Sequence, residues 1–265
     1  LLPDGRALQI GTVHNLGQTF AKVFEIRIQR RDESIDYAWQ TSYGISERIV
    51  ASVIAIHGDE RGLVLPPKVA PIQIVIVPIP SKDKDETMKI LEESRSIYNE
   101  LKNSGFRTKL DDRMELRPAE KYYEWEIKGV PLRIEIGPRE LMSRKVTFFR
   151  RDIFERIEVD RTKVIDTAEK LLLTISDNLG RRSWKWFRDH IYRFSSLDDA
   201  RPIIENRQGI VELPWCGRES CGLRIGEELG GRTLGSPVGS IDMANKRCVI
   251  CGKQAITIMR IAKTY

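Results

Sequence analysis

Four cysteines near the end of the chain have the types and spacing of a metal-binding set. Cys216 and Cys221 are separated by four residues, Cys248 and Cys251 by two, and glycine directly follows three of them, at positions 217, 222 and 252. Paired short turns of this kind can present four thiolates as a tetrahedron, the coordination that zinc prefers. Four thiolates leave no position open for water, so we expect a structural Zn²⁺ ion. Free buried thiols, or disulfides in a secreted protein, are the alternatives.

A second set of polar side chains lies in the first 69 residues, among segments otherwise suited to the centre of a β-sheet. Gln9, Thr12 and His14 stand where a chain that needed only a core would have Val or Ile. A buried polar group without a partner costs roughly 1 to 3 kcal/mol. The pattern therefore suggests a binding site, although each residue taken alone is also typical of a hydrogen-bonded core position.

The elements around these residues follow from the spacing of apolar side chains. Residues Ala7–Gly11 and Lys22–Ile28 have the composition of strands. Between Ile45 and Ile56 apolar residues recur at helical spacing, which places Arg48 near the start of a helix. Prolines at positions 66 and 67 then mark a boundary, so we expect a first module over residues 1–69.

Residues 70–178 alternate between strand and helix patterns and predict a compact α/β domain. Its longest helix is expected at Lys84–Asn103, with Gly105 as a stop. The other elements are strands at Ile72–Ile79, Phe106–Leu110, Val130–Ile136 and Lys145–Phe149, and helices at Pro118–Lys128 and Thr162–Asn178.

Residues 179–265 form a third predicted module, which begins with a basic stretch rich in tryptophan and contains all four cysteines. Cations interleaved with aromatic residues can bind nucleic acid. Helical spacing favours core packing instead, with Trp184, Phe187, His190 and Ile191 facing inward.

The composition of the chain limits its possible partners and its cellular location. The 265 residues include 44 Lys and Arg against 38 Asp and Glu, a formal charge of +6 that tilts modestly toward a polyanionic partner. There is no apolar run of membrane-spanning length and no secretory leader. We expect a cytoplasmic protein without a membrane partner. Because the sequence starts at Leu1, without an initiator Met, we also expect it to be a fragment.

The polar stretches of the first module resemble class II aminoacyl-tRNA synthetases, and specifically the prolyl-tRNA synthetase family of the archaeal and eukaryotic type. The resemblance is carried by residues 5–18 (GRALQIGTVHNLGQ), by the third class II motif at 41–48 (TSYGISER) and by residues 57–67, and it extends to the final Tyr265. It implies an α/β and α+β multidomain fold. The parts are the end of an antiparallel-sheet catalytic domain at 1–69, an anticodon-binding domain at 70–178 and a zinc-binding α+β domain at 179–265.

The same resemblance assigns roles to single residues. It makes Gln9, Thr12, Ser46 and Arg48 contacts to ATP, with Gln9 also near the Mg²⁺ ion, and it places His14 in the proline pocket. The Tyr265 carboxylate would lie near the active site. The segment His57-Gly58-Asp59 also matches the family, but a turn at a helix end would use the same residues, so we assign it no catalytic role.

In the second module the family pattern falls on residues 124–139 (EWEIKGVPLRIEIGPR) and implies anticodon contacts at Glu126, Arg133 and Arg139. The proline anticodon ends in two guanines, whose donors suit a carboxylate and whose acceptors suit an arginine. A surface network of ion pairs would use the same three residues.

The resemblance thus implies an enzyme that activates proline with ATP and Mg²⁺, transfers it to tRNA(Pro) and works as a homodimer. The first and second class II motifs are expected upstream of Leu1, so the chain alone should be inactive. The alternative is a non-catalytic, tRNA-binding paralogue or module of a synthetase. A third hypothesis is a zinc protein that acts in protein assembly.

Overall fold

The computed structural model describes residues 1–239 and 241–265, which divide into two compact units. One unit combines Leu1–Ser52 with His190–Tyr265, and the other is Val53–Asp189. Both units mix helices with strands, as the sequence predicts. The three predicted modules, with boundaries at residues 69/70 and 178/179, stay a prediction. Within the described residues no helix is both long and apolar enough to cross a membrane.

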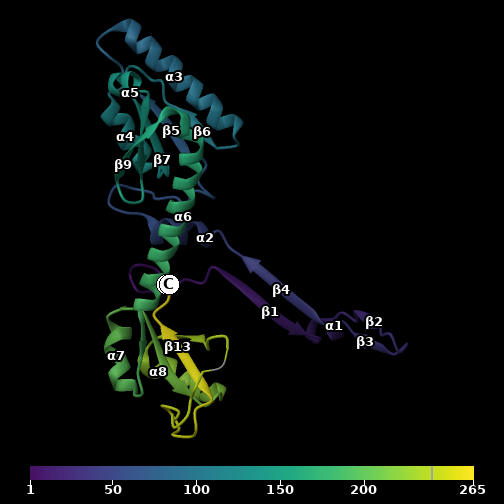
Figure 1. Cartoon of the computed structure of the whole chain (residues 1–265). Helices are drawn as coiled ribbons and strands as arrows, with labels where there is room; N and C mark the ends of the chain where they lie inside the picture. The colour runs from purple at the N-terminus through teal and green to yellow at the C-terminus, as the bar shows by residue number, and fades with distance from the viewer. Residues whose placement is uncertain (240) are drawn as a thin grey trace. The chain divides into compact units, whose positions relative to one another are not determined.

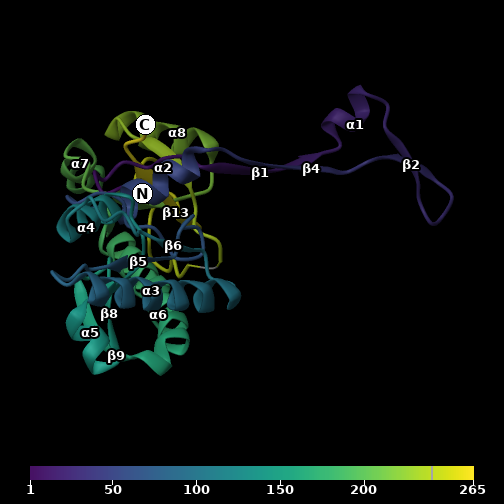
Figure 2. The same ribbon diagram turned by 90° about the horizontal axis from the view of Figure 1, so that it is seen from above.

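Residues 11–46 form a narrow antiparallel ribbon. Strand β1 (Gly11–Gly17) pairs with β4 (Gln40–Ile45), and α1 (Thr19–Val23), β2 (Arg27–Gln29) and β3 (Ile35–Tyr37) lie at its far end (Figures 1 and 2). The ribbon has no core of its own, because Val13, Tyr43 and Ile45 are each more than 70% exposed. Helix α2 (Arg48–His57) follows, with Arg48 at its start as predicted.

Two strand predictions in this region are wrong. The strand begins only at Gly11, and residues 7–10 contribute just an isolated bridge from Ala7 to Thr264, a partner that the local sequence does not reveal. Of the predicted strand at 22–28, Lys22 and Val23 belong to helix α1 and only Arg27 and Ile28 belong to β2. Glu25, with φ +53°, lies in the turn between the two elements.

The unit Val53–Asp189 is built on a five-stranded mixed sheet in the order β6-β5-β7-β8-β9. The strands are β5 (Ile74–Pro78), β6 (Thr108–Leu110), β7 (Leu132–Ile136), β8 (Lys145–Arg150) and β9 (Glu155–Asp160). Every residue of β5 is buried, which fits its continuous apolar run. Ile74 and Ile76 pack in one core cluster, and Val75 and Val77 pack with Trp125 in another.

Helices cover both faces of this sheet (Figure 1). Helix α3 (Lys84–Asn103) and helix α6 (Val164–Asp189), which the 3-10 turn η1 (Arg161–Lys163) precedes, pack on one face, and α4 (Pro118–Ile127) packs on the other. The short α5 (Pro138–Ser143) precedes β8. The bounds of α3 are those predicted, and Asp83 caps it by accepting a hydrogen bond from the Asp85 amide.

Helix α6 does not end at Asn178 but continues to Asp189. Gly180 lies inside this helix, and packing does not require a glycine there, since an added Cβ would meet nothing within 4 Å. The predicted inward orientation of Trp184 is wrong, because its side chain is 61% exposed and packs edge-on against the Phe187 ring at 5.7 Å.

The remaining residues of the first unit form a four-stranded sheet in the order β10-β11-β13-β12, covered by two helices. The strands are β10 (Ile191–Arg193), β11 (Ile210–Trp215), β12 (Arg232–Gly235) and β13 (Thr257–Ala262), and the helices are α7 (Leu197–Glu205) and α8 (Glu219–Leu229). The start of the chain packs against this part, since Leu2 and Gly5 are buried and Ala7 bonds to the Lys263 carbonyl at 2.8 Å.

Candidate functional sites

A cavity of about 800 Å³ in the first unit is lined by two of the residues assigned to ATP, Gln9 and Arg48. The two residues touch, because Arg48 Nη1 donates to the Gln9 carbonyl at 3.4 Å. Arg232 of β12 lines the same cavity, and its lining includes no Asp or Glu side chain. Two guanidinium groups beside one cavity suit an anionic ligand. Sequence reasoning missed Arg232, because nothing near it in the sequence links it to residues 9 and 48.

The last residue, Tyr265, also lines this cavity and is held there by the start of the chain. Its amide donates to the Ala7 carbonyl at 3.3 Å, and the Arg6 guanidinium lies 3.8 Å from the centre of its ring. The Tyr265 hydroxyl donates to Asp4, and this hydrogen bond raises the pKa of the phenol. The end of the chain is thereby fixed beside Gln9 and Arg48.

The other residues assigned to ATP and proline lie on the ribbon and do not line that cavity. Thr12 stands opposite Gly44, where an added Cβ would come within 3.3 Å of the Thr12 hydroxyl, and exposed His14 stands opposite Ser42. Because they are two residues apart in one strand, Thr12 and His14 share a face of β1. Ser46 donates through its amide to the Ile10 carbonyl at 3.0 Å.

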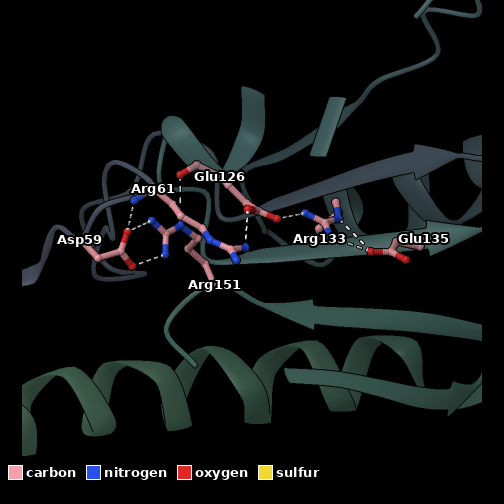
Figure 3. A network of polar contacts seen from close by, with 6 residues as sticks. All are labelled: Asp59, Arg61, Glu126, Arg133, Glu135 and Arg151. Atoms are coloured by element: carbon pink, nitrogen blue, oxygen red, sulfur yellow. Dashed lines mark hydrogen bonds and ion pairs between the residues drawn. The ribbon is translucent and has the colours of Figure 1, made fainter. Parts of the chain in front are cut away.

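Two of the residues assigned to the anticodon, Glu126 and Arg133, form an ion pair in the second unit (Figure 3). Arg133 Nη1 lies 3.1 Å from Glu126 Oε1, and its other nitrogens donate to Glu135 at 2.8 and 2.9 Å. The Arg133 side chain is only 3% exposed and lies between the rings of Tyr122 and Phe149, at 3.8 and 4.1 Å. Its donors are therefore engaged inside the protein, where they orient Glu126.

Arg139, the third residue of that set, lies apart from this pair on the surface. Its side chain is 72% exposed and makes ion pairs with Glu140 at 3.1 Å and Glu158 at 2.9 Å. Glu158 is itself 49% exposed, and an exposed pair stabilises a fold by no more than about 1 kcal/mol, so the arginine can exchange this partner for another anion at small cost.

A network around Glu126 includes residues to which the sequence analysis gave no role (Figure 3). Arg151 donates to both oxygens of Asp59 and, through Nε, to the Glu126 carbonyl at 3.1 Å. Arg61 Nη1 lies 3.4 Å from Glu126 Oε2. No local signal in the sequence predicts these contacts, because Asp59 and Arg151 are 92 residues apart.

The four cysteines meet in one cluster, as their spacing predicts. All four are free thiols, and their sulfur atoms lie within 4.8 Å of one another. Four sulfur ligands at about 2.3 Å from a tetrahedral zinc ion would be about 3.8 Å apart. The Sγ atoms of Cys216 and Cys251 are 3.8 Å apart. The cluster therefore fits a zinc ion without rearrangement of that pair.

Hydrogen bonding favours the thiolate form of Cys216, and burial opposes it at Cys221. A hydrogen bond from the Arg218 side chain lowers the pKa of Cys216 to about 6, whereas burial raises the pKa of Cys221 to about 11. A buried thiolate is stabilised by a bound cation, so the donor set is suited to a metal.

Family comparisons agree with this architecture. Residues 73–171 match the family model described as "Anticodon binding domain", and residues 197–265 match the one described as "Prolyl-tRNA synthetase, C-terminal". Together they identify the class as the aminoacyl-tRNA synthetases.

Curated relatives indicate which member of this class the chain resembles. The chain is 49% identical over 266 residues to the proline--tRNA ligase of Ignicoccus hospitalis, 50% over 265 residues to that of Metallosphaera sedula and 46% over 268 residues to that of Thermococcus kodakarensis. Each match covers 100% of this chain and 55% of the relative, so the chain spans about half the length of these proteins. The resemblance to archaeal prolyl-tRNA synthetases is thus confirmed along the whole chain.

Proposed function

We propose that the full-length protein is a proline–tRNA ligase, which forms prolyl-adenylate from proline and ATP and transfers the prolyl group to tRNA(Pro). The observation that carries this proposal is the sequence identity of 46 to 50% to such ligases over the whole chain. The exposed apolar side chains of the ribbon support it, because a larger antiparallel sheet would cover them. Residues 1–69 would then be the end of the class II catalytic domain.

Adenylate formation requires the proline carboxylate to attack the α-phosphate of ATP while pyrophosphate leaves, so the enzyme must hold several anionic groups in place. Arg48 can stack its planar guanidinium on adenine and donate to phosphate oxygens. The Gln9 amide can bind a phosphate oxygen or a water of the Mg²⁺ ion, and the hydroxyls of Thr12 and Ser46 add donors. His14 would shape the proline pocket, and the Tyr265 carboxylate would lie nearby.

In the second unit, we assign guanine binding to the carboxylate of Glu126, which can accept hydrogen bonds from N1 and N2 of the base. Arg139 would contact an acceptor edge or a phosphate. Arg133 acts on Glu126 in this proposal, because its burial and its ion pairs fix the carboxylate. This differs from the direct base contact expected from the sequence.

The cysteine cluster would hold a structural Zn²⁺ ion that fastens the segment 248–251 to the start of α8. With four sulfur ligands the ion supplies no Lewis acid to the reaction. We also propose that the full-length protein is a homodimer and is located in the cytoplasm.

The experiment is proline-dependent exchange of pyrophosphate into ATP by the full-length gene product. We expect exchange, and we expect Arg48→Ala to reduce it by more than about a hundredfold, as removal of a charged transition-state contact does. Arg31→Ala, which removes an exposed arginine of the ribbon, is the matched control and should leave the rate unchanged. A protein that binds tRNA without any exchange would instead be the non-catalytic paralogue.

A further inference from the structure

The turn between β8 and β9 ends on a phenylalanine in an unusual backbone conformation. Phe154 has φ +57°, a value that glycine and asparagine adopt readily and that bulky residues rarely adopt. Its ring is nevertheless 40% exposed and is not buried in a core. A strained residue that keeps a large exposed side chain points to a role in binding.

The ring of Phe154 lies between aromatic and cationic neighbours. The Arg61 guanidinium is 4.5 Å from its centre and the Arg151 guanidinium 5.1 Å, and the Phe149 ring packs against it at 6.2 Å with a tilt of 54°. The side chain of Arg61 is 59% exposed, so part of its planar group stays open to solvent. A phenyl ring and a guanidinium plane are the two surfaces on which unpaired nucleobases stack.

Arg61 links the Phe154 ring to the carboxylate that we assign to guanine. Arg61 contacts the Phe154 ring. Its Nη1 also lies 3.4 Å from Glu126 Oε2 (Figure 3). Recognition of an unpaired guanine needs an acceptor for its edge and a flat surface for its face. Glu126 offers the acceptor, and Arg61 with Phe154 offers the surface.

We propose that Arg61 and Phe154 form a stacking platform for an unpaired base of the RNA, beside Glu126. The platform rests on the proposed function, because it adds two binding residues to the same RNA site. If Phe154 served only to cover the Arg151–Asp59 pair, its replacement would change stability and leave RNA binding unchanged.

The probe is a short RNA stem-loop with the proline anticodon, titrated against the 265-residue chain. Phe154→Asn removes the ring and keeps a residue that tolerates positive φ, so the fold should be as stable as the wild type or more stable. We expect RNA affinity to fall about tenfold with an unchanged salt dependence, because only stacking is lost. Phe154→Trp should bind within about threefold of the wild type, since the stacking face remains.

Two further variants complete the test. Arg61→Gln should weaken binding and also reduce the slope of affinity against salt, because it removes a charge. Ile153→Ala, which removes exposed apolar surface from the same turn, should bind like the wild type. A loop in which 2-aminopurine replaces each base in turn should show fluorescence quenching at one position that Phe154→Asn abolishes.

Failure of the platform is distinct from failure of the proposed function. If the wild type prefers the proline loop over a loop whose anticodon guanines are replaced by adenine, and Phe154→Asn shows the same affinity and preference, the platform is wrong and the proposed function stands. If the wild type shows no preference for the proline loop, the assignment of Glu126 to guanine is wrong and the platform beside it is wrong as well, whereas the proposed ligase activity is decided by the pyrophosphate exchange.

Discussion

Arg151 donates to the two carboxylate oxygens of Asp59 at 2.6 Å each, and its side chain is 1% exposed. Residues 59–65 are thereby fastened to the rest of the second unit, because the amides of Leu63 and Leu65 also bond to the carbonyls of Ile127 and Gly129. The Asp59 carboxylate is thus a structural counter-charge. The hydrogen bond from Arg151 lowers the pKa of Asp59 below its ordinary value.

Asp59→Asn should therefore destabilise the second unit. Loss of the carboxylate leaves a buried guanidinium without a counter-charge, which we expect to cost about 2 kcal/mol, below the range for fully buried pairs because Asp59 is partly exposed. Urea denaturation measures the change. Glu60→Gln, at the next and exposed position, is the control and should change the free energy of unfolding by less than about 0.5 kcal/mol. Equal effects of the two variants would refute the structural role of Asp59.

The packing of the chain start against the C-terminal sheet can be tested at Gly5. This residue has φ +75°, and an added Cβ would lie 1.6 Å from the Arg207 carbonyl oxygen. Gly235 in the same unit has φ +103° with nothing within 4 Å, so Gly235→Ala should cost only the backbone strain, about 1 kcal/mol. Gly5→Ala should lower the urea midpoint much further, because the turn must also move away from Arg207. Similar midpoints for both variants would show that this packing is absent in solution.

A pH dependence follows from Asp111, which is 2% exposed. Burial alone would raise the pKa of this carboxyl, but hydrogen bonds from Arg113 and Trp125 outweigh burial and lower the pKa to about 2, from an ordinary value of 3.8. Since the folded value lies below the unfolded one, the stabilisation is complete above pH 3.8 and is lost as the pH falls toward 2.

We therefore expect Asp111→Asn to be less stable than the wild type at pH 6, with the difference shrinking between about pH 4 and pH 2. Unfolding followed by Trp fluorescence at a series of pH values tests this expectation. A difference that stays constant through that range would contradict the ion pair.

The cysteine cluster makes a prediction about metal content. The 265-residue chain should contain about one zinc per molecule, and Cys248→Ser should lose most of it, because three thiolates and a hydroxyl hold zinc far less tightly than four thiolates. Removal of zinc from the wild type by a chelator should lower the melting temperature of the first unit. Zinc-free wild-type protein with unchanged stability would show that the four residues are ordinary buried thiols.

A feature of the structure can be predicted from the sequence when the residues that determine it lie close together in the chain. Helix α3 is predicted to the residue because its apolar spacing and the Gly105 stop are local features of the sequence. The cysteine cluster is predicted because paired turns bring the thiols together. The short α5 and the edge strand β9 are missed, as is the continuation of α6, since their boundaries depend on tertiary packing.

The candidate sites show the same limit. Residue types and family resemblance indicate Gln9 with Arg48 and Glu126 with Arg133, and the structure brings each pair into contact. The burial of Arg133 between two rings is not visible in the sequence, because Tyr122 and Phe149 come from different elements. Phe154 could not be found either, since its role depends on the backbone angle of one turn and on Arg61, 93 residues earlier in the chain.

The most direct test of the account is the affinity of this chain for full-length tRNA(Pro) transcripts that differ only in the anticodon. We expect the transcript with both anticodon guanines to bind at least about tenfold more tightly than one with adenines in their place, because each lost base contact costs about 1 to 3 kcal/mol. Glu126→Gln should remove most of that difference. Equal affinity of the wild-type chain for the two transcripts would contradict the assignment of residues 73–171 to anticodon recognition.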